Sequence, residues 1–188
     1  MEFEVSPGAP ADFTLYVRKP DWSSHASIVS QSVVSGRVID GYFPIRRRWY
    51  PGSKFTLKLD MKPELLESNA RVVENNGRVA VQRGPLVYCL EELDQHAGTS
   101  LADVAIRAEK NSSAGFSEAF ENDLLGGVLV LRHEGSASKQ SAARSSLYFS
   151  ADAPASSSSK VDLKFIPYYA WANRRPTPMQ VWTPLQRS

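Results

Sequence analysis

Two short stretches of the sequence are rich in carboxylates, side chains that often perform acid–base chemistry in hydrolases. A pair of carboxylates about 5–10 Å apart can cleave a glycosidic bond, with one residue as the acid and the other as base or nucleophile. One stretch follows an apolar run, the other lies in a predicted loop, and nothing in either pattern marks a residue as buried or paired. We therefore predict that these acids are surface charges. They are Glu91, Glu92, Asp94, Glu118, Glu121 and Asp123.

Other sequence patterns for catalysis or metal binding are absent. His25, His96 and His133 are far apart, and none has a second ligand at a metal-like spacing. The single cysteine, Cys89, lies in the apolar run 86–90, which favours a buried, inert thiol over a nucleophile. One cysteine also excludes an internal disulfide and a zinc site built from several cysteines. We predict no catalytic residue, metal ligand or cofactor-binding residue in this chain.

An aromatic stretch near the C-terminus is the most promising place for a contact with another molecule. Flat rings can stack on sugars, but aromatic side chains also provide the largest apolar burial in β-cores. For the aromatic residues as a group we favour packing, with a sugar platform as the alternative. The candidate residues, for a carbohydrate contact or an interdomain contact, are Tyr168, Tyr169, Trp171, Asn173 and Arg174.

Alternating apolar and polar residues predict that strands position these side chains. Successive side chains of a strand point to opposite faces, so an apolar residue at every second position indicates a half-buried strand. Helix signals are thin, and the pattern as a whole predicts an all-β fold, a β-sandwich or jelly roll. The predicted strands cover residues 13–18, 38–39, 45–49, 55–60, 78–82, 104–108, 127–131, 147–149, 161–165 and 179–182.

Glycine, proline, asparagine and serine separate these strands. Asn75-Asn76-Gly77 predicts a tight turn and Pro51-Gly52 a type II turn, because both contain residues that accept positive φ. Gly84-Pro85 interrupts an apolar run and predicts a bulge or a crossing between sheets. The serine-rich segments 136–146 and 152–159 are predicted to be mobile surface loops.

The overall composition is that of an ordinary soluble protein. The 188 residues include 22 basic and 20 acidic side chains, a net charge of +2, so we predict neither nucleic acid nor membrane as a partner. Arg46, Arg47 and Arg48 form the longest basic run and are predicted to be the solvated part of a strand. The acidic N-terminus is unlike a secretory signal, and no apolar stretch approaches the roughly 20 residues of a membrane span.

Four motifs in the same order resemble one enzyme family, the bacterial β-L-arabinofuranosidases of glycoside hydrolase family 127. Residues 75–91, from Asn75-Asn76-Gly77 to Glu91, are similar to a signature of this family. The other three motifs lie near the two ends and in the middle, so the resemblance spans nearly the whole chain. They are residues 13–22, residues 123–128, and residues 166–174 followed by 179–182.

This resemblance implies that the catalytic machinery lies outside the chain. The family's enzymes are retaining exo-glycosidases with an N-terminal (α/α)6 barrel followed by two β-sandwiches. Their zinc-bound cysteine nucleophile and glutamate acid/base belong to the barrel. This chain is similar only to the part after the barrel, so no catalytic residue is carried over. The chain departs from the family at residues 51–54, where the family more often has Gly-Asp.

The resemblance also predicts the domain organisation and the function. Residues 1–91 with 177–188 would form one sandwich, to which the last strand returns, and residues 92–176 a second. A single merged sandwich is the alternative. The predicted function is an accessory part that supports the missing barrel and takes part in dimerisation. Two alternatives stay open, a free-standing carbohydrate-binding module that binds oligosaccharide and a structural interaction domain. We expect a soluble bacterial protein of the cytoplasm or periplasm.

Overall fold

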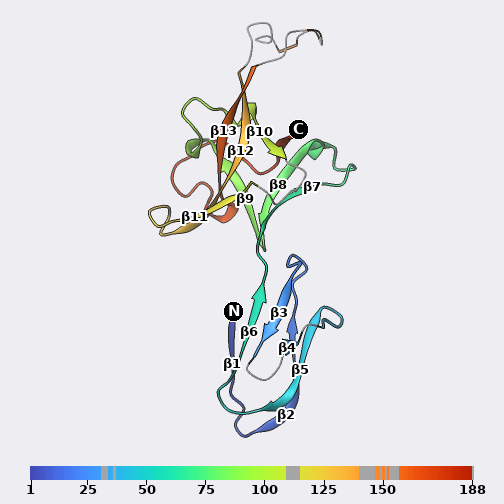
Figure 1. The fold of residues 1–188 in the computed structure, drawn as a ribbon. Coiled ribbons are helices and arrows are strands. Elements are labelled where there is room, and N and C mark those ends of the chain that lie inside the picture. Colours follow the sequence, from blue (N-terminus) through green and yellow to red (C-terminus); the bar gives the residue numbers. More distant parts are fainter. Residues whose placement is uncertain are drawn as a thin grey trace. The chain divides into compact units, whose positions relative to one another are not determined.

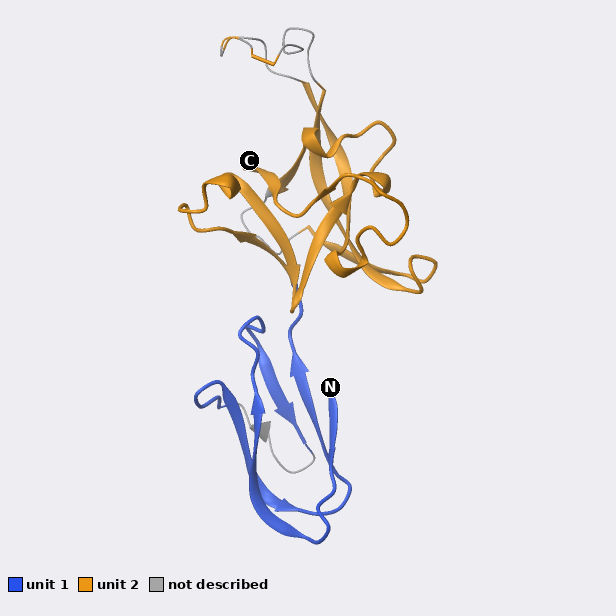
Figure 2. Ribbon diagram, turned by 180° about the vertical axis from the view of Figure 1, so that it is seen from behind, with its two compact units in different colours: residues 1–62 blue, residues 63–188 orange. Residues whose placement is uncertain are grey.

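The chain consists of two compact units, Met1–Lys62 and Pro63–Ser188, shown in separate colours in Figure 2. The computed structural model describes residues 1–30, 34–35, 37–108, 115–139, 147–148, 150, 152 and 157–187. Within these residues the regular structure is strands and single turns of 3-10 helix, which confirms the prediction of an all-β chain.

Unit 1 contains two antiparallel sheets (Figure 1). One sheet has the strand order β1-β6-β3-β4, and the other is the pair β2-β5. The side chains that face inward from both sheets share one core, which is why the alternation of apolar residues was visible in the sequence. The strands are β1 (Glu2–Val5), β2 (Ala11–Arg18), β3 (Ala26–Val29), β4 (Val34–Ser35), β5 (Tyr42–Trp49) and β6 (Ser53–Leu59).

The core of unit 1 is built around Trp49 at the end of β5. Its ring is fully buried and lies 6.1 Å from the ring of Phe55, and its indole nitrogen donates a hydrogen bond of 3.1 Å to the carbonyl oxygen of Phe13. The predicted type II turn at Pro51-Gly52 is confirmed, since Gly52 has a φ of +78° and Ser53 N donates to Tyr50 O at 3.0 Å.

The arginine run on β5 is only in part the solvated segment that the sequence predicted. Arg46 and Arg48 are exposed. Arg47 lies on the same face of the strand as the buried Ile45 and Trp49, because side chains alternate along a strand. Its guanidinium carbon is 4.1 Å from the centre of the Trp49 ring, and its Nη1 donates to the hydroxyl of Ser30 at 3.0 Å. The prediction was therefore wrong for the middle arginine.

Unit 2 is a closed barrel of six strands with three further strands attached. Each strand pairs with the next in the order β9-β13-β12-β10-β15-β8, and β8 pairs with β9 to close the ring. Strands β7, β11 and β14 pair with β8, β12 and β9. The barrel strands are β8 (Arg78–Arg83), β9 (Leu86–Glu91), β10 (Val104–Ala108), β12 (Val128–Lys139), β13 (Ser157–Pro167) and β15 (Thr183–Arg187). The attached strands are β7 (Pro63–Glu67), β11 (Ser117–Glu121) and β14 (Met179–Gln180).

Strand β9 is buried on both faces from Tyr88 to Glu91. Tyr88 and Leu90 point into the main core of unit 2, while Cys89 points into a smaller cluster that includes Ile166 and Ala170. Because side chains alternate, Glu91 lies on the same face as Cys89. The aromatic stretch with η5 (Tyr168–Ala170) packs on this face, while β14 pairs with the end of β9 within the sheet.

The predicted domain boundary at residue 91 differs from the structure, which divides the chain between residues 62 and 63. Strands β8 and β9 were assigned to the first sandwich, yet they pair with β15 and β13 and close the barrel of unit 2. The last strand, β15, returns to β8 and β10, both in unit 2. The error arose because β8 pairs with a strand about a hundred residues further along the chain and β9 with one more than seventy residues further along, where local patterns carry no pairing information.

Several connections also differ from the predictions. Gly84-Pro85 is the turn of the β8–β9 hairpin, with Arg83 opposite Leu86, and not a bulge or a crossing between sheets. The serine-rich segments are in part strand, since β12 extends to Lys139 and pairs with Ser157 of β13. Most residues between these two strands, including residue 149 of the predicted strand 147–149, lie outside the described part, and residues 147 and 148 form a bend.

Candidate functional site

The predicted contact residues follow β13 as one loop, residues 167–174, that carries three exposed rings. Tyr168, Tyr169 and Trp171 are 46%, 62% and 38% exposed. The rings of Tyr168 and Trp171 stack on each other, with centres 6.0 Å apart and an angle of 25° between their planes. We call these three residues the ring surface.

The side chain of Glu91 is hydrogen-bonded to the backbone of this loop. It is fully buried at the end of β9, and its Oε1 accepts a hydrogen bond of 3.0 Å from the backbone N–H of Ala172. Ala172 has a φ of +61°, a left-handed conformation that costs a residue with a β-carbon about 1–2 kcal/mol. The hydrogen bond from a buried carboxylate offsets this cost and fixes the path of the loop beside Trp171.

Arg174 joins the same loop to two acids. Its Nη2 contacts carboxylate oxygens of both Glu91 and Asp94, and its Nη1 donates to Asp94 Oδ1 at 2.8 Å. Asp94 also lies 3.4 Å from Lys164 Nζ on β13, and Lys164 donates to Glu121 at 2.6 Å. We call Glu91, Asp94, Lys164 and Arg174 the buried charge cluster.

The electrostatics of this cluster favour its charged state. Burial alone would raise the pKa of Asp94, but the hydrogen bond from Arg174 and the positive charge of Lys164 outweigh burial and hold this pKa below its usual value. The hydrogen bond to Asp94 raises the pKa of Arg174 against the opposing effect of burial. Two carboxylates held in this way around a guanidinium are suited to fixing a loop. They are poorly suited to proton transfer, because both are bound to Arg174 and closed to solvent.

The prediction that these acids are surface charges was wrong for Glu91 and Asp94. A signal for Glu91 was present, since it continues a strand that is apolar on both faces and shares the face of Cys89. The partner that stabilises both carboxylates, Arg174, is 80 or more residues away in sequence, so no local pattern could reveal the pairing.

Asn173 and Arg174, the polar candidates of the loop, have hydrogen-bond or ion-pair partners within the loop and the buried charge cluster. Asn173 Nδ2 lies 3.3 Å from Tyr169 O and 3.2 Å from Trp171 O, and donates to these carbonyl oxygens. Arg174 is bound to Glu91 and Asp94. The structure therefore brings all five predicted contact residues together, but it gives Asn173 and Arg174 structural partners.

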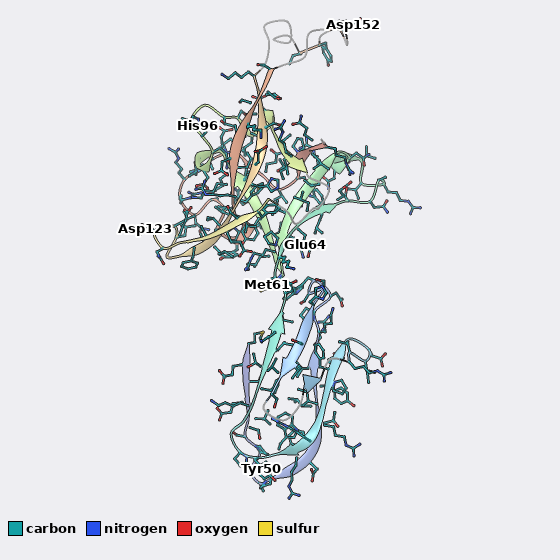
Figure 3. The ribbon with its side chains drawn as sticks, viewed as in Figure 1. Tyr50, Met61, Glu64, His96, Asp123 and Asp152 are labelled. Atoms are coloured by element: carbon teal, nitrogen blue, oxygen red, sulfur yellow. The ribbon has the colours of Figure 1, made fainter. Side chains whose placement is uncertain are left out.

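The other candidate acids and histidines do not meet at one place. Figure 3 shows His96 and Asp123 on separate loops of unit 2. Glu118 pairs with Arg83 at 2.9 Å, and Glu92 accepts a bond of 3.2 Å from Leu101 N. His133 is buried, with its ring centre 4.4 Å from that of Phe116.

The chemical setting of Cys89 does not fit a zinc ligand or a nucleophile. The residue is fully buried, and burial raises the pKa of its thiol to about 12. Within the described ranges, no group of three histidine, cysteine or acidic residues is arranged to hold a metal ion. The family zinc site needs several such ligands, and the described residues offer no group that would match it.

A hollow of about 680 Å³ on unit 2 is bordered on one side by Asp94 of the buried charge cluster. It is bordered by residues 94–100 and by the adjacent ends of β12 and β13, and none of the three rings lines it. The aromatic rings and this hollow are thus different surfaces. No helix in the part of the chain described is long and apolar enough to cross a membrane.

The fold and the site together describe a β chain of two units. One unit carries an aromatic surface on a loop that buried charged residues bind. Comparison with protein families assigns both units. Residues 63–184 match the glycoside hydrolase family 127 C-terminal domain, and residues 1–61 match the family 127 middle domain of β-L-arabinofuranosidase. The chain therefore belongs to glycoside hydrolase family 127, as its motifs indicated, and the two matches meet where the structure divides.

Individual relatives agree with this assignment. A non-reducing end β-L-arabinofuranosidase of Bifidobacterium longum subsp. longum is 32% identical over 97% of the chain, which covers 28% of that protein. A family 127 β-L-arabinofuranosidase of Geobacillus stearothermophilus T6 has a solved structure with a TM-score of 0.84 and 34% identity over 100% of the chain, or 28% of its own. A second solved family 127 β-arabinofuranosidase has a TM-score of 0.81 and 26% identity. The match covers 98% of this chain and 29% of that structure's chain. The chain thus spans less than a third of the length of these relatives.

Proposed function

We propose that this chain is an accessory, non-catalytic part of a β-L-arabinofuranosidase-like glycoside hydrolase, and that it supports a catalytic (α/α)6 barrel. The observation that carries the proposal is the match to the middle and C-terminal domains of the family over less than a third of the relatives' length. A middle domain implies a domain before it. The zinc, the cysteine nucleophile and the glutamate acid/base would belong to that preceding domain.

A joined protein tests this proposal. It consists of the part of the Geobacillus stearothermophilus relative that precedes the matched region, followed by the 188 residues of this chain. We expect the joined protein to hydrolyse an aryl β-L-arabinofuranoside. We also expect the barrel and this chain to unfold together in one cooperative transition. An inactive joined protein whose two parts unfold independently would contradict the supporting role.

The same proposal extends to fold type and assembly. We propose a β-sandwich of jelly-roll type for unit 1, supported by its two sheets around one core. For unit 2 the closed ring of strands favours a barrel over the second sandwich that was expected. A bacterial origin is supported by the bacterial relatives. Dimerisation is part of the proposal, and light scattering at several protein concentrations tests it directly.

A carbohydrate-binding module is the second candidate, because the rings of Tyr168, Tyr169 and Trp171 are exposed on one loop. Calorimetric titration of the chain with arabinose and arabino-oligosaccharides tests this alternative. Binding at millimolar concentration that is lost in Trp171→Ala, with the fold retained, would favour it. No heat of binding would remove it.

A further inference from the structure

The ring surface lies on a loop that is bound to the barrel by buried polar contacts, which distinguishes it from a set of scattered exposed rings. A single exposed apolar residue needs no explanation, whereas several on one loop mark an interaction site. Here the loop beneath the rings is tied to the barrel by Glu91 and Arg174. Burying a carboxylate is unfavourable unless it is paired and hydrogen-bonded, and the cluster provides both. The barrel thus presents the rings in one preset geometry, as a docking surface requires.

The neighbours of the rings favour a protein partner over a sugar. A sugar platform needs free hydrogen-bonding groups beside the ring that it stacks on, because sugar hydroxyls lose water on binding. Asn173 is bound to two carbonyls of its own loop, and Arg174 is bound to two carboxylates. Tyr168 and Trp171 also use one ring face each against the other. Tyrosine and tryptophan side chains are enriched at the centre of protein interfaces.

We propose that the ring surface docks against the polypeptide that precedes the middle domain in family 127 enzymes. This inference rests on the proposed function, since it names the surface by which the chain supports that part. The length of the relatives argues for this partner, because about 70% of each lies outside the matched region. Glu91 and Arg174 act as positioning residues for the rings and do not themselves meet the partner.

Hydroxyl-radical footprinting of the isolated chain and of the joined protein tests the docking. We expect the oxidation rates of Tyr168, Tyr169 and Trp171 to fall several-fold in the joined protein. Phe120 on β11, which is 61% exposed in the same unit, is the matched control and should be oxidised equally in both. In addition, Trp171→Ala should lower the melting temperature of the joined protein more than that of the isolated chain, while Phe120→Ala should lower both alike.

The outcomes separate this inference from the proposed function. If the joined protein is active and its rings are oxidised as fast as in the isolated chain, the docking is wrong and the supporting role stands. If the rings are protected but the joined protein is inactive, the docking is supported and the function is not. If the parts unfold separately and the rings remain reactive, both are wrong. Sugar binding by the isolated chain that depends on Trp171 would overturn the choice of a protein partner.

Discussion

Replacing Arg174 by methionine removes a positive charge that contacts both buried carboxylates at the end of β9. Glu91 would keep the N–H of Ala172 as a partner, and Asp94 would keep Lys164 at 3.4 Å. Neither contact replaces the guanidinium, which contacts both acids and is only 21% exposed. We therefore expect Arg174→Met to be the most damaging single change in the loop.

The expected cost is about 3 kcal/mol, at the low end for breaking a buried ion pair, because Lys164 and Ala172 still contact the acids. For a chain of this size the loss corresponds to a fall in melting temperature of roughly 10 °C. Arg175→Met is the matched control, because Arg175 is adjacent and exposed. It should change stability by less than about 0.5 kcal/mol.

The difference in free energy of unfolding between Arg174→Met and the natural chain should depend on pH. In the natural chain the pKa of Asp94 lies below its usual 3.8, so this carboxylate contributes stability above that pH and loses it as pH falls through the lower folded value. Without Arg174, the hydrogen bond that most lowers the pKa of Asp94 is lost while burial still acts to raise it, so this pKa is higher in the variant and Asp94 takes up its proton at a higher pH than in the natural chain. The gap in stability should therefore narrow between about pH 7 and pH 4.

Urea unfolding at pH 7 and pH 4 measures both effects, with hydrogen exchange of the β9 amides to report on unit 2 alone. Equal stability of Arg174→Met and Arg175→Met at pH 7 would show that the buried charge cluster does not hold the loop. A gap that stays constant with pH would refute the electrostatic part.

Two further predictions concern the barrel. Cys89, with a thiol pKa of about 12, should not react with a thiol reagent at pH 8 until urea unfolds the chain, and rapid reaction of the folded chain would contradict its burial. Gly135→Ala would place a β-carbon 2.4 Å from Leu163 Cδ1 and 2.7 Å from the carbonyl oxygen of Ala105. It should cost about 3 kcal/mol in urea unfolding, while Gly8→Ala, with nothing within 4 Å, should be neutral.

The all-β fold and the family could be predicted from the sequence because both depend on local patterns. Alternation in segments such as 55–60 reflects one buried face, which each strand records by itself. Motifs such as residues 166–174 likewise need no knowledge of distant partners, and they identified the family that the domain matches confirm.

Features that depend on distant partners could not be predicted. The boundary was placed about thirty residues late because β8 and β9 pair with strands from the far end of the chain. Glu91 and Asp94 resembled surface acids because their cation is supplied by Arg174. Arg47 was misjudged for a different, local reason, since its place beside the Trp49 ring follows from the alternation of its own strand, which the prediction set aside for the usual exposure of arginine.

The central claim, an accessory role without chemistry of its own, is tested most directly by turnover. The purified 188-residue chain is incubated with an aryl β-L-arabinofuranoside, beside the joined protein at the same molar concentration. We expect the joined protein to release the aryl group and the chain alone to release none above the uncatalysed rate. Turnover that co-purifies with the chain alone would show that it has a catalytic site of its own.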